Sequence, residues 1–346
     1  MGKKLRIAQI APLWIPLPPR TYGGIELMLS LLTEELVKRG YDITLFASGD
    51  SKTIAKLISP TETAIWLQKG LRSPHGYITI ALEMIRKLRH KFDLIHNHFD
   101  FFMFPLFIMD GKKPILTTLH RPLDSVTIET LKIYNKIKFC AISNDQRESA
   151  REHGIEIIDV VYNGINPENY TFRETPEDYF MYLGRLNKEK GIVPAIQIAK
   201  KAGVKLLIAG NIVGGEEWNY FLHEVQPVLN EENINFVGQV DFKEKVRLLA
   251  GAKALLFPID RREPFGLVMI EAMACGTPVI AYRRGSVPEV VADGQTGFVV
   301  ENEQEMIEAI KKIDSIKREN CRAHVEKNFT LSQMVDKYEK IYKKLI

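Results

Sequence analysis

Several common signals are scarce or missing in this chain of 346 residues. Its three cysteines, Cys140, Cys275 and Cys321, are far apart and lack the spacing of a zinc site or a disulfide framework. The longest apolar run, 101–109, covers nine residues, whereas a membrane-spanning helix needs about 20. The basic start runs into a proline-rich loop without a small-residue cleavage site. We therefore expect no signal peptide and a reduced, cytoplasmic protein.

The sequence also lacks a strong excess of charge of either sign. Lys and Arg total 47 against 43 Asp and Glu, which gives a formal net charge of +4. So small an excess argues against nucleic acid as a partner. The basic segment 83–91 is compatible with an amphipathic helix on anionic lipid, but a solvated helix face explains it better. Peripheral membrane contact is therefore not favoured, and we expect the run 101–109 to be core.

Strand-like and helix-like segments alternate along the sequence. Short β-branched runs and helical patterns follow one another from end to end, which predicts an α/β fold with parallel sheets covered by helices. The helical pattern is clearest over 24–39, with Gly40 placed to end the helix. We predict strands at 5–12, 42–48, 93–97, 114–120, 138–143 and 158–164, and then at 179–185, 205–210, 234–238, 254–259, 278–282 and 297–300.

The polar segment 163–178, which carries two prolines, interrupts this alternation. We place a domain boundary there, which gives a first domain over 1–170 and a second over 171–330, both doubly wound. The last segment, 331–346, predicts a terminal amphipathic helix with Met334, Tyr338, Ile341 and Tyr342 on one stripe.

Unusual polar residues occur where predicted strands end. His96 and His98 belong to one strand end, and His120, Arg185 and Asn211 to three others. In doubly wound sheets a ligand binds beyond the carboxyl ends of the strands. Two such edges that face each other predict a cleft between the domains.

Two loops have the composition of an anion site. Gly23 and Gly24 open the first long helix, and Arg185 and Lys190 lie on either side of a short strand-to-helix loop, where they suit a diphosphate. Glycines needed only for turn geometry and ordinary loop cations are the alternatives. The fingerprint G-x-G-x-x-G is missing after the first strand and after Arg185, which argues against a dehydrogenase.

The segment 263–281 is the most informative. Its helical part, 265–275, is apolar almost all round but contains Glu271. A buried carboxylate needs donors, so either a neighbouring cation or the hydroxyls of a ligand must satisfy it. Taken alone, Glu263 reads as a surface loop charge.

Together these motifs resemble the retaining glycosyltransferases of family 4 over essentially the whole chain. The matching motifs are the GG-I-E loop, H-x-H, TTLH, YNGIN, YLGRLNKEKG, GSVPEVVADGQTGFVV and above all EPFGLVMIEAMACGTPVIA, which contains the E-x7-E pattern of Glu263 and Glu271. The resemblance implies the GT-B architecture of two Rossmann-like domains. The first domain would bind the acceptor and the second the nucleotide-sugar donor, and the helix 331–346 would cross back to the first domain.

The resemblance also implies roles for single residues. Catalytic roles fall to His120 near the reacting carbon, to Arg185 and Lys190 on the donor diphosphate, and to Glu263 on hydroxyls of the transferred sugar. Donor-binding roles fall to Gly23, Gly24, Asn211, Phe265, Gly266, Leu267 and Glu271, of which Glu271 would bind the ribose. For His96 and His98 a role in supporting the site is favoured over contact with the donor.

No D-x-D triplet, the metal-binding motif of the other major glycosyltransferase fold, occurs in the chain. We therefore expect no metal and no cofactor, and a metal site built from His96, His98 and Asp100 is disfavoured. The resemblance implies retention of the anomeric configuration, with attack from the face of the leaving group. The acceptor class stays open between a small molecule, a glycan and a lipid-linked molecule, and the donor between UDP, GDP and ADP sugars. A sugar-nucleotide 2-epimerase and a non-catalytic nucleotide-sugar sensor are the competing hypotheses.

Overall fold

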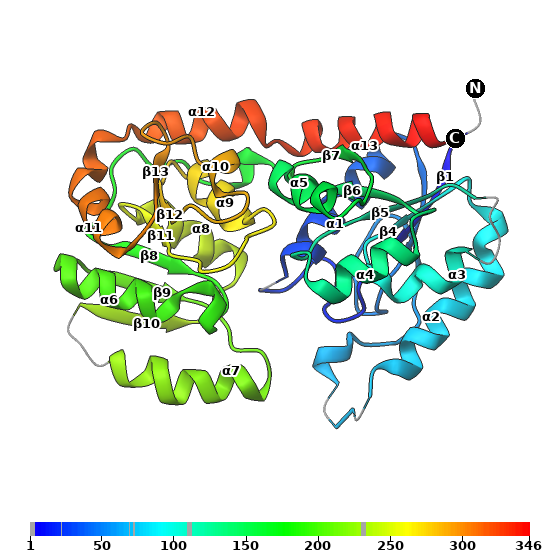
Figure 1. The fold of residues 1–346 in the computed structure, drawn as a ribbon, viewed down its shortest axis with the longest axis horizontal. Coiled ribbons are helices and arrows are strands. Elements are labelled where there is room, and N and C mark those ends of the chain that lie inside the picture. Colours follow the sequence, from blue (N-terminus) through cyan, green and yellow to red (C-terminus); the bar gives the residue numbers. More distant parts are fainter. Residues whose placement is uncertain (1–3, 22, 69, 72, 109–112, 230–232) are drawn as a thin grey trace. The chain divides into compact units, whose positions relative to one another are not determined.

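The computed structural model describes residues 4–21, 23–68, 70–71, 73–108, 113–229 and 233–346. It divides into two compact units (Figure 1). Unit 1 comprises residues 1–164 and 331–346, and unit 2 comprises residues 165–330. The chain therefore leaves unit 1 inside the polar segment 163–178 and returns to it at the terminal helix.

Unit 1 is a parallel sheet of seven strands in the order β3-β2-β1-β4-β5-β6-β7. The strands are β1 (Arg6–Ile10), β2 (Asp42–Phe46), β3 (Lys56–Ile58), β4 (Leu94–Asn97), β5 (Ile115–Thr118), β6 (Lys138–Ala141) and β7 (Ile157–Val160). The helices are α1 (Gly24–Lys38), α2 (His75–Leu88), α3 (Phe104–Ile108), α4 (Ser125–Ile133), α5 (Asn144–Glu152) and α13 (Leu331–Leu345).

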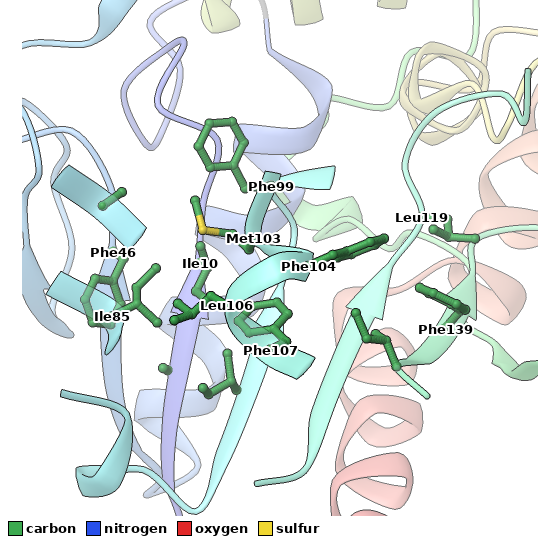
Figure 2. Packing of buried hydrophobic residues seen from close by; sticks show 14 of the residues in the cluster. Ile10, Phe46, Ile85, Phe99, Met103, Phe104, Leu106, Phe107, Leu119 and Phe139 are labelled. Atoms are coloured by element: carbon green, nitrogen blue, oxygen red, sulfur yellow. The ribbon is translucent and has the colours of Figure 1, made fainter. Parts of the chain in front are cut away.

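Two apolar clusters fill the faces of this sheet. Figure 2 shows the first, in which Phe104, Leu106 and Phe107 pack near Ile10 and Phe139. The run 101–109 was expected to be core. Met103, Phe104, Leu106 and Phe107 are buried, whereas Phe101 is 36% exposed and Pro105 is exposed, so the expectation holds for only part of the described run. The second cluster joins α1 to the buried stripe of α13, whose predicted apolar residues Met334, Tyr338, Ile341 and Tyr342 are all buried.

Unit 2 is a parallel sheet of six strands in the order β10-β9-β8-β11-β12-β13. The strands are β8 (Phe180–Leu183), β9 (Leu206–Ala209), β10 (Ile234–Gly238), β11 (Leu255–Phe257), β12 (Val279–Tyr282) and β13 (Gly297–Val300). The helices are α6 (Ile192–Ala202), α7 (Gly214–Tyr220), α8 (Phe242–Gly251), α9 (Leu267–Ala274), α10 (Val287–Val290), α11 (Glu303–Lys312) and α12 (Arg318–Asn328).

Short helical turns complete the two units. The 3-10 turns are Ile65–Leu67, Arg89–Lys91, Asp100–Met103, Pro167–Asn169, Lys188–Lys190, Gln226–Val228 and Ile313–Ser315, and Phe221–Val225 is a π-helical turn. In the part of the chain that the structure describes, no helix has both the length and the apolar composition needed to cross a membrane.

Every predicted strand corresponds to an observed one, usually with its ends shortened by one to three residues. The edge strand β3 was not predicted. It has three residues, none of them buried, so its sequence carries neither the apolar run of a central strand nor a clear alternation. The central strand β4 is buried at all four positions, which is why its sequence was easy to recognise.

Candidate active site

The loops of unit 2 that carry the predicted residues gather at the carboxyl edge of the sheet, because its strands all run parallel. Arg185 lies two residues after β8, and Asn211 lies two residues after the neighbouring strand β9. The Leu186 amide donates to the Asn211 carbonyl oxygen at 2.9 Å, so these two loops run side by side. Glu263 follows β11, which borders β8 on its other side. The side chain of Asn211 has a buried oxygen without a hydrogen-bond partner among the described residues.

Lys190 and Glu263 form a buried ion pair. Lys190 ends the 3-10 turn 188–190, where the Asn187 side chain accepts a hydrogen bond from the Lys190 amide at 3.0 Å. The Lys190 Nζ donates to Glu263 Oε2 at 2.6 Å, and Glu263 is only 7% exposed. The alternative of a surface loop charge for Glu263 is therefore wrong. Two of the predicted site residues lie in direct contact.

The loop after β12 holds the backbone of Glu263. The Ser286 amide donates to the Glu263 carbonyl oxygen at 2.9 Å. A Cβ at Gly285, whose φ is 59°, would lie 2.4 Å from the Glu263 amide nitrogen, so only glycine allows this approach. The Ser286 hydroxyl is fully buried and finds no hydrogen-bond partner among the described residues. A ligand or an ordered water beside Glu263 would satisfy it. The GSVPEVV motif could have pointed to Ser286, which the sequence analysis missed.

Arg185 pairs with Glu217, a residue that the sequence analysis did not identify. The Arg185 guanidinium donates to Glu217 Oε1, which also accepts from Asn187 Nδ2 at 3.0 Å. The other carboxylate oxygen accepts from the Val213 amide at 2.6 Å. Glu217 thereby ties the loop after β8 to the start of α7. Glu217 directly follows Glu216 in the sequence. The local sequence pattern does not distinguish the buried Glu217 from the exposed Glu216.

Glu271 has structural partners of its own. It is 5% exposed, and its Oε1 accepts from the Tyr170 hydroxyl at 3.0 Å and from Lys245 Nζ at 2.5 Å. Burial, followed by the nearby Glu271 charge, raises the pKa of Tyr170 well above its usual value, so the phenol stays protonated and donates. Of the two alternatives for this carboxylate, the neighbouring cation is present as Lys245. A role toward ribose stays a prediction.

The start of α9 lies next to Glu263. Gly266 precedes the helix with a φ of 77°, and a Cβ there would lie 2.6 Å from the Met269 methyl carbon and 3.4 Å from Glu263 Cγ. Phe265 is buried against Phe329, with ring centroids 5.9 Å apart. The amides that begin α9 at Leu267 lack partners inside the helix, so this end favours an anion or a sugar oxygen. The roles of Phe265, Gly266 and Leu267 toward a donor stay predictions.

In unit 1 the glycine loop has a geometric reason for its composition. Gly23 has a φ of 144°, and a Cβ there would lie 2.9 Å from Pro19 Cβ and 2.9 Å from Glu26 Oε2. Gly24 begins α1 directly after it. Glu26 is 5% exposed, and burial raises its pKa to about 7. Turn geometry therefore accounts for Gly23, and anion binding by this loop stays a prediction.

His96, His98 and His120 belong to one largely buried chain of hydrogen bonds in unit 1. His98 Nδ1 lies 2.9 Å from His120 Nε2, and His98 Nε2 lies 3.0 Å from Gln9 Oε1. His96 lies within β4 rather than at its end and contacts the Tyr342 hydroxyl at 2.7 Å. Burial holds the pKa of all three imidazoles below the usual value, that of His120 at about 3, so they are neutral at neutral pH.

Among the described residues, no group of three or more His, Cys, Asp and Glu side chains is arranged to hold a metal ion. Asp100 instead pairs with Arg121, whose Nε lies 2.8 Å from Asp100 Oδ2. His96 and His98 use their ring nitrogens within the hydrogen-bonded chain.

Known proteins with the same pattern identify the family. Residues 22–169 match the model described as Glycosyltransferase Family 4, and residues 168–330 match Glycosyl transferases group 1. The chain belongs to glycosyltransferase family 4. It is 26% identical to the N-acetyl-alpha-D-glucosaminyl L-malate synthase of Bacillus anthracis, over 92% of this chain and 93% of the synthase.

Solved structures show the same fold. The sucrose-phosphate synthase of Thermosynechococcus elongatus superimposes with a TM-score of 0.83 at 20% identity, over 99% of both chains. Anabaena HepE, solved in complex with UDP-glucose, gives a TM-score of 0.77 at 18% identity, over 99% of this chain and 100% of that one. The predicted α/β GT-B fold with two doubly wound domains is confirmed, and the chain is a glycosyltransferase.

Proposed function

We propose that this glycosyltransferase moves a sugar from a nucleoside diphosphate sugar to a hydroxyl acceptor, retains the anomeric configuration and needs no metal. The acceptor class stays open between a small molecule, a glycan and a lipid-linked molecule. We also expect the protein to act in the cytoplasm, without nucleic acid and without a cofactor. Binding of UDP-glucose by a family neighbour supports the donor class.

The observation that carries the proposal is the buried Lys190–Glu263 ion pair at the carboxyl edge of unit 2. A carboxylate this buried needs a donor at all times. Sugar hydroxyls can replace Lys190 as donors to Glu263, which releases the ammonium group to contact a diphosphate oxygen. In that exchange every buried charge keeps a partner, so donor binding leaves no uncompensated ion.

Two further ion pairs of unit 2, Arg185 with Glu217 and Lys245 with Glu271, fit the same scheme. Arg185 can present its remaining guanidinium N–H groups to the diphosphate while Glu217 holds it in place. Glu271, which Lys245 and Tyr170 hold in place, has further lone pairs for the ribose hydroxyls. We propose that these fixed cations and the helix-end amides balance the charge of the departing diphosphate.

The proposed stereochemistry follows the family. Attack from the face of the leaving group would let the departing phosphate accept the acceptor proton, so no enzyme nucleophile is required. The prediction for Glu263→Gln is that products keep the retained configuration and that no covalent glycosyl-enzyme forms. A trapped sugar adduct on Glu263 of the wild-type protein would overturn this route.

An assay of nucleoside diphosphate release tests the function. Purified protein in EDTA is incubated with UDP, GDP and ADP sugars, with and without an acceptor panel, and the products are analysed by mass spectrometry and by proton NMR of the anomeric signal. We expect acceptor-dependent release and retention. Interconversion of the donor sugar without an acceptor would favour a 2-epimerase. Donor binding without turnover under any acceptor would favour a sensor.

A further inference from the structure

The buried hydrogen-bonded chain of unit 1 reaches from His120 to the terminal helix α13. It runs from His120 through His98 and Gln9 to Tyr342, and on to His96. Gln9, His96, His98 and Tyr342 are each 0% exposed, so water does not compete for the bonds among these four residues, whereas the bond from His98 to His120 is only partly buried. Four separate segments contribute: β1, β4 with the residue after it, the loop after β5, and α13.

The orientation of the Gln9 amide decides which atoms donate in this series of hydrogen bonds. Its Nε2 donates to the Tyr342 hydroxyl at 3.2 Å, and its Oε1 faces His98 Nε2 at 3.0 Å. An amide oxygen only accepts, so His98 carries its proton on Nε2. A neutral imidazole has a single N–H, so His98 Nδ1 is an acceptor and takes a hydrogen bond from His120 Nε2–H. His120 Nδ1 is then left as an acceptor.

The Tyr342 hydroxyl links the Gln9 amide to His96. It accepts from Gln9 and therefore donates to His96 Nδ1 at 2.7 Å. His96 Nε2–H then donates to Thr118 Oγ1 at 2.8 Å. Turning the Gln9 amide over would reverse every donor in the chain and place the His120 proton on Nδ1. The donor-to-acceptor direction of these hydrogen bonds therefore determines which ring nitrogen of His120 carries the proton.

We propose that Tyr342 and Gln9 are positioning residues that fix His120 in the Nε2–H tautomer through His98, so that Nδ1 accepts a hydrogen bond from a substrate hydroxyl. The proposal rests on the predicted role of His120 at the donor sugar. It makes α13, the last helix in the sequence, part of the catalytic apparatus of unit 1. It also gives His98 a defined supporting function.

Tyr338 provides a matched control on the same helix. Its hydroxyl contacts Thr118 Oγ1 at 3.1 Å, and it is as deeply buried as Tyr342. Thr118 accepts from His96 whether or not Tyr338 has a hydroxyl, because the threonine hydroxyl can rotate. Tyr338→Phe therefore deletes one buried oxygen from α13 without touching the chain from His96 to His120.

The test is a nitrogen-15 NMR measurement on histidine-labelled full-length protein, without substrate, at pH 7.5. Spectra of His120→Gln identify the His120 signals. Wild type is expected to show one His120 tautomer, protonated at Nε2. Tyr342→Phe, and as a second variant Gln9→Met, should give averaged or mixed tautomers, while Tyr338→Phe keeps the wild-type pattern. An Nδ1–H tautomer in wild type would overturn the proposal, as would an unchanged pattern in both Tyr342→Phe and Gln9→Met. So would equal disturbance by Tyr338→Phe.

Steady-state kinetics supply the second arm. Tyr342→Phe should lower kcat by about tenfold or more with KM for the donor within about twofold, because a histidine in the wrong tautomer loses its function while binding persists. Mixed tautomers with unchanged kcat would reject the positioning role. Absence of sugar transfer by the wild type would reject the proposed function instead and would leave the tautomer result intact.

Discussion

The two units satisfy their buried polar groups in opposite ways. Unit 2 pairs full charges at the carboxyl edge of its sheet: Lys190 with Glu263, Arg185 with Glu217 and Lys245 with Glu271. Unit 1 joins neutral imidazoles, an amide and hydroxyls into one chain. Charged pairs suit a ligand that carries several charges, whereas a neutral chain suits the orientation of single hydrogen bonds.

The largest expected effect is that of acid on unit 1. His96, His98 and the half-buried His120 are neutral in the folded protein and gain protons on unfolding below their ordinary pKa of about 6.5. The unfolded state therefore binds more protons as the pH falls. The free energy of unfolding should drop by about 1.4 kcal/mol per pH unit for each histidine below pH 6.5.

Urea titrations between pH 7 and pH 5 check this with separate reporters. Trp218→Phe leaves Trp14 and Trp66, both in unit 1, as the tryptophans of the chain. Replacing Trp14 and Trp66 instead leaves Trp218 in unit 2. The unit 1 transition should move to lower urea at pH 5 more than the unit 2 transition. Equal shifts of the urea midpoint in both reporters would contradict the expected difference between the units.

The next effect concerns the charge pairs of unit 2. Lys245→Met leaves Glu271 as a buried carboxylate without its cation, which should cost about 3 to 5 kcal/mol of unfolding free energy. The double variant Lys245→Met with Glu271→Gln removes both charges and should recover much of that loss. Chemical denaturation of the two variants decides the point. If the single variant loses less than 1 kcal/mol, Glu271 is not held by this pair.

Turnover should depend on the two cations assigned to the diphosphate. Arg185→Ala and Lys190→Ala should each lower kcat by about a hundredfold or more, because charge stabilisation in the transition state is lost. Lys201→Ala, which removes an exposed cation paired with Glu303 elsewhere in unit 2, is the control and should keep normal kcat. Near-normal turnover of both Arg185→Ala and Lys190→Ala would reject their role.

A further effect is expected at Glu26, a buried carboxyl group in unit 1. Its pKa is about 7 because burial disfavours the carboxylate, so stability falls as the pH rises from 4.5 through 7. Glu26→Gln should therefore raise the melting temperature at pH 8 and leave it nearly unchanged at pH 4.5. An equal shift at both pH values would show that packing, rather than ionisation, governs this position.

The sequence predicted the fold well because buried parallel strands read as apolar runs, as in β4, whereas the short edge strand β3 has no such run. The family resemblance named both Lys190 and Glu263 as site residues, but their contact came only from the structure, because Glu263 taken alone had the composition of a surface loop charge. The sequence did not reveal Glu217, Lys245 or Tyr170. These residues act through partners 26 to 101 positions away in the sequence, and their local patterns are those of ordinary helix and loop residues.

The series of hydrogen bonds from His120 to Tyr342 could not be predicted from the sequence for a related reason. The resemblance identified His120, and the terminal helix was predicted with Tyr342 on its apolar stripe. A tyrosine on such a stripe indicates burial and says nothing of the hydroxyl's partner. That partner depends on where β1 and β4 place Gln9 and His96, which are neighbours in the register of the sheet.

The central claim is that the charged edge of unit 2 binds a nucleoside diphosphate through fixed cations. Calorimetric titration of UDP, GDP and ADP in EDTA, with wild type and with Lys190→Ala, tests it most directly. We expect one of the three to bind the wild type and to bind Lys190→Ala at least about tenfold more weakly, as loss of a charge-assisted hydrogen bond requires. Equal affinity of the two proteins, or no binding of any of the three without a metal, would contradict the account.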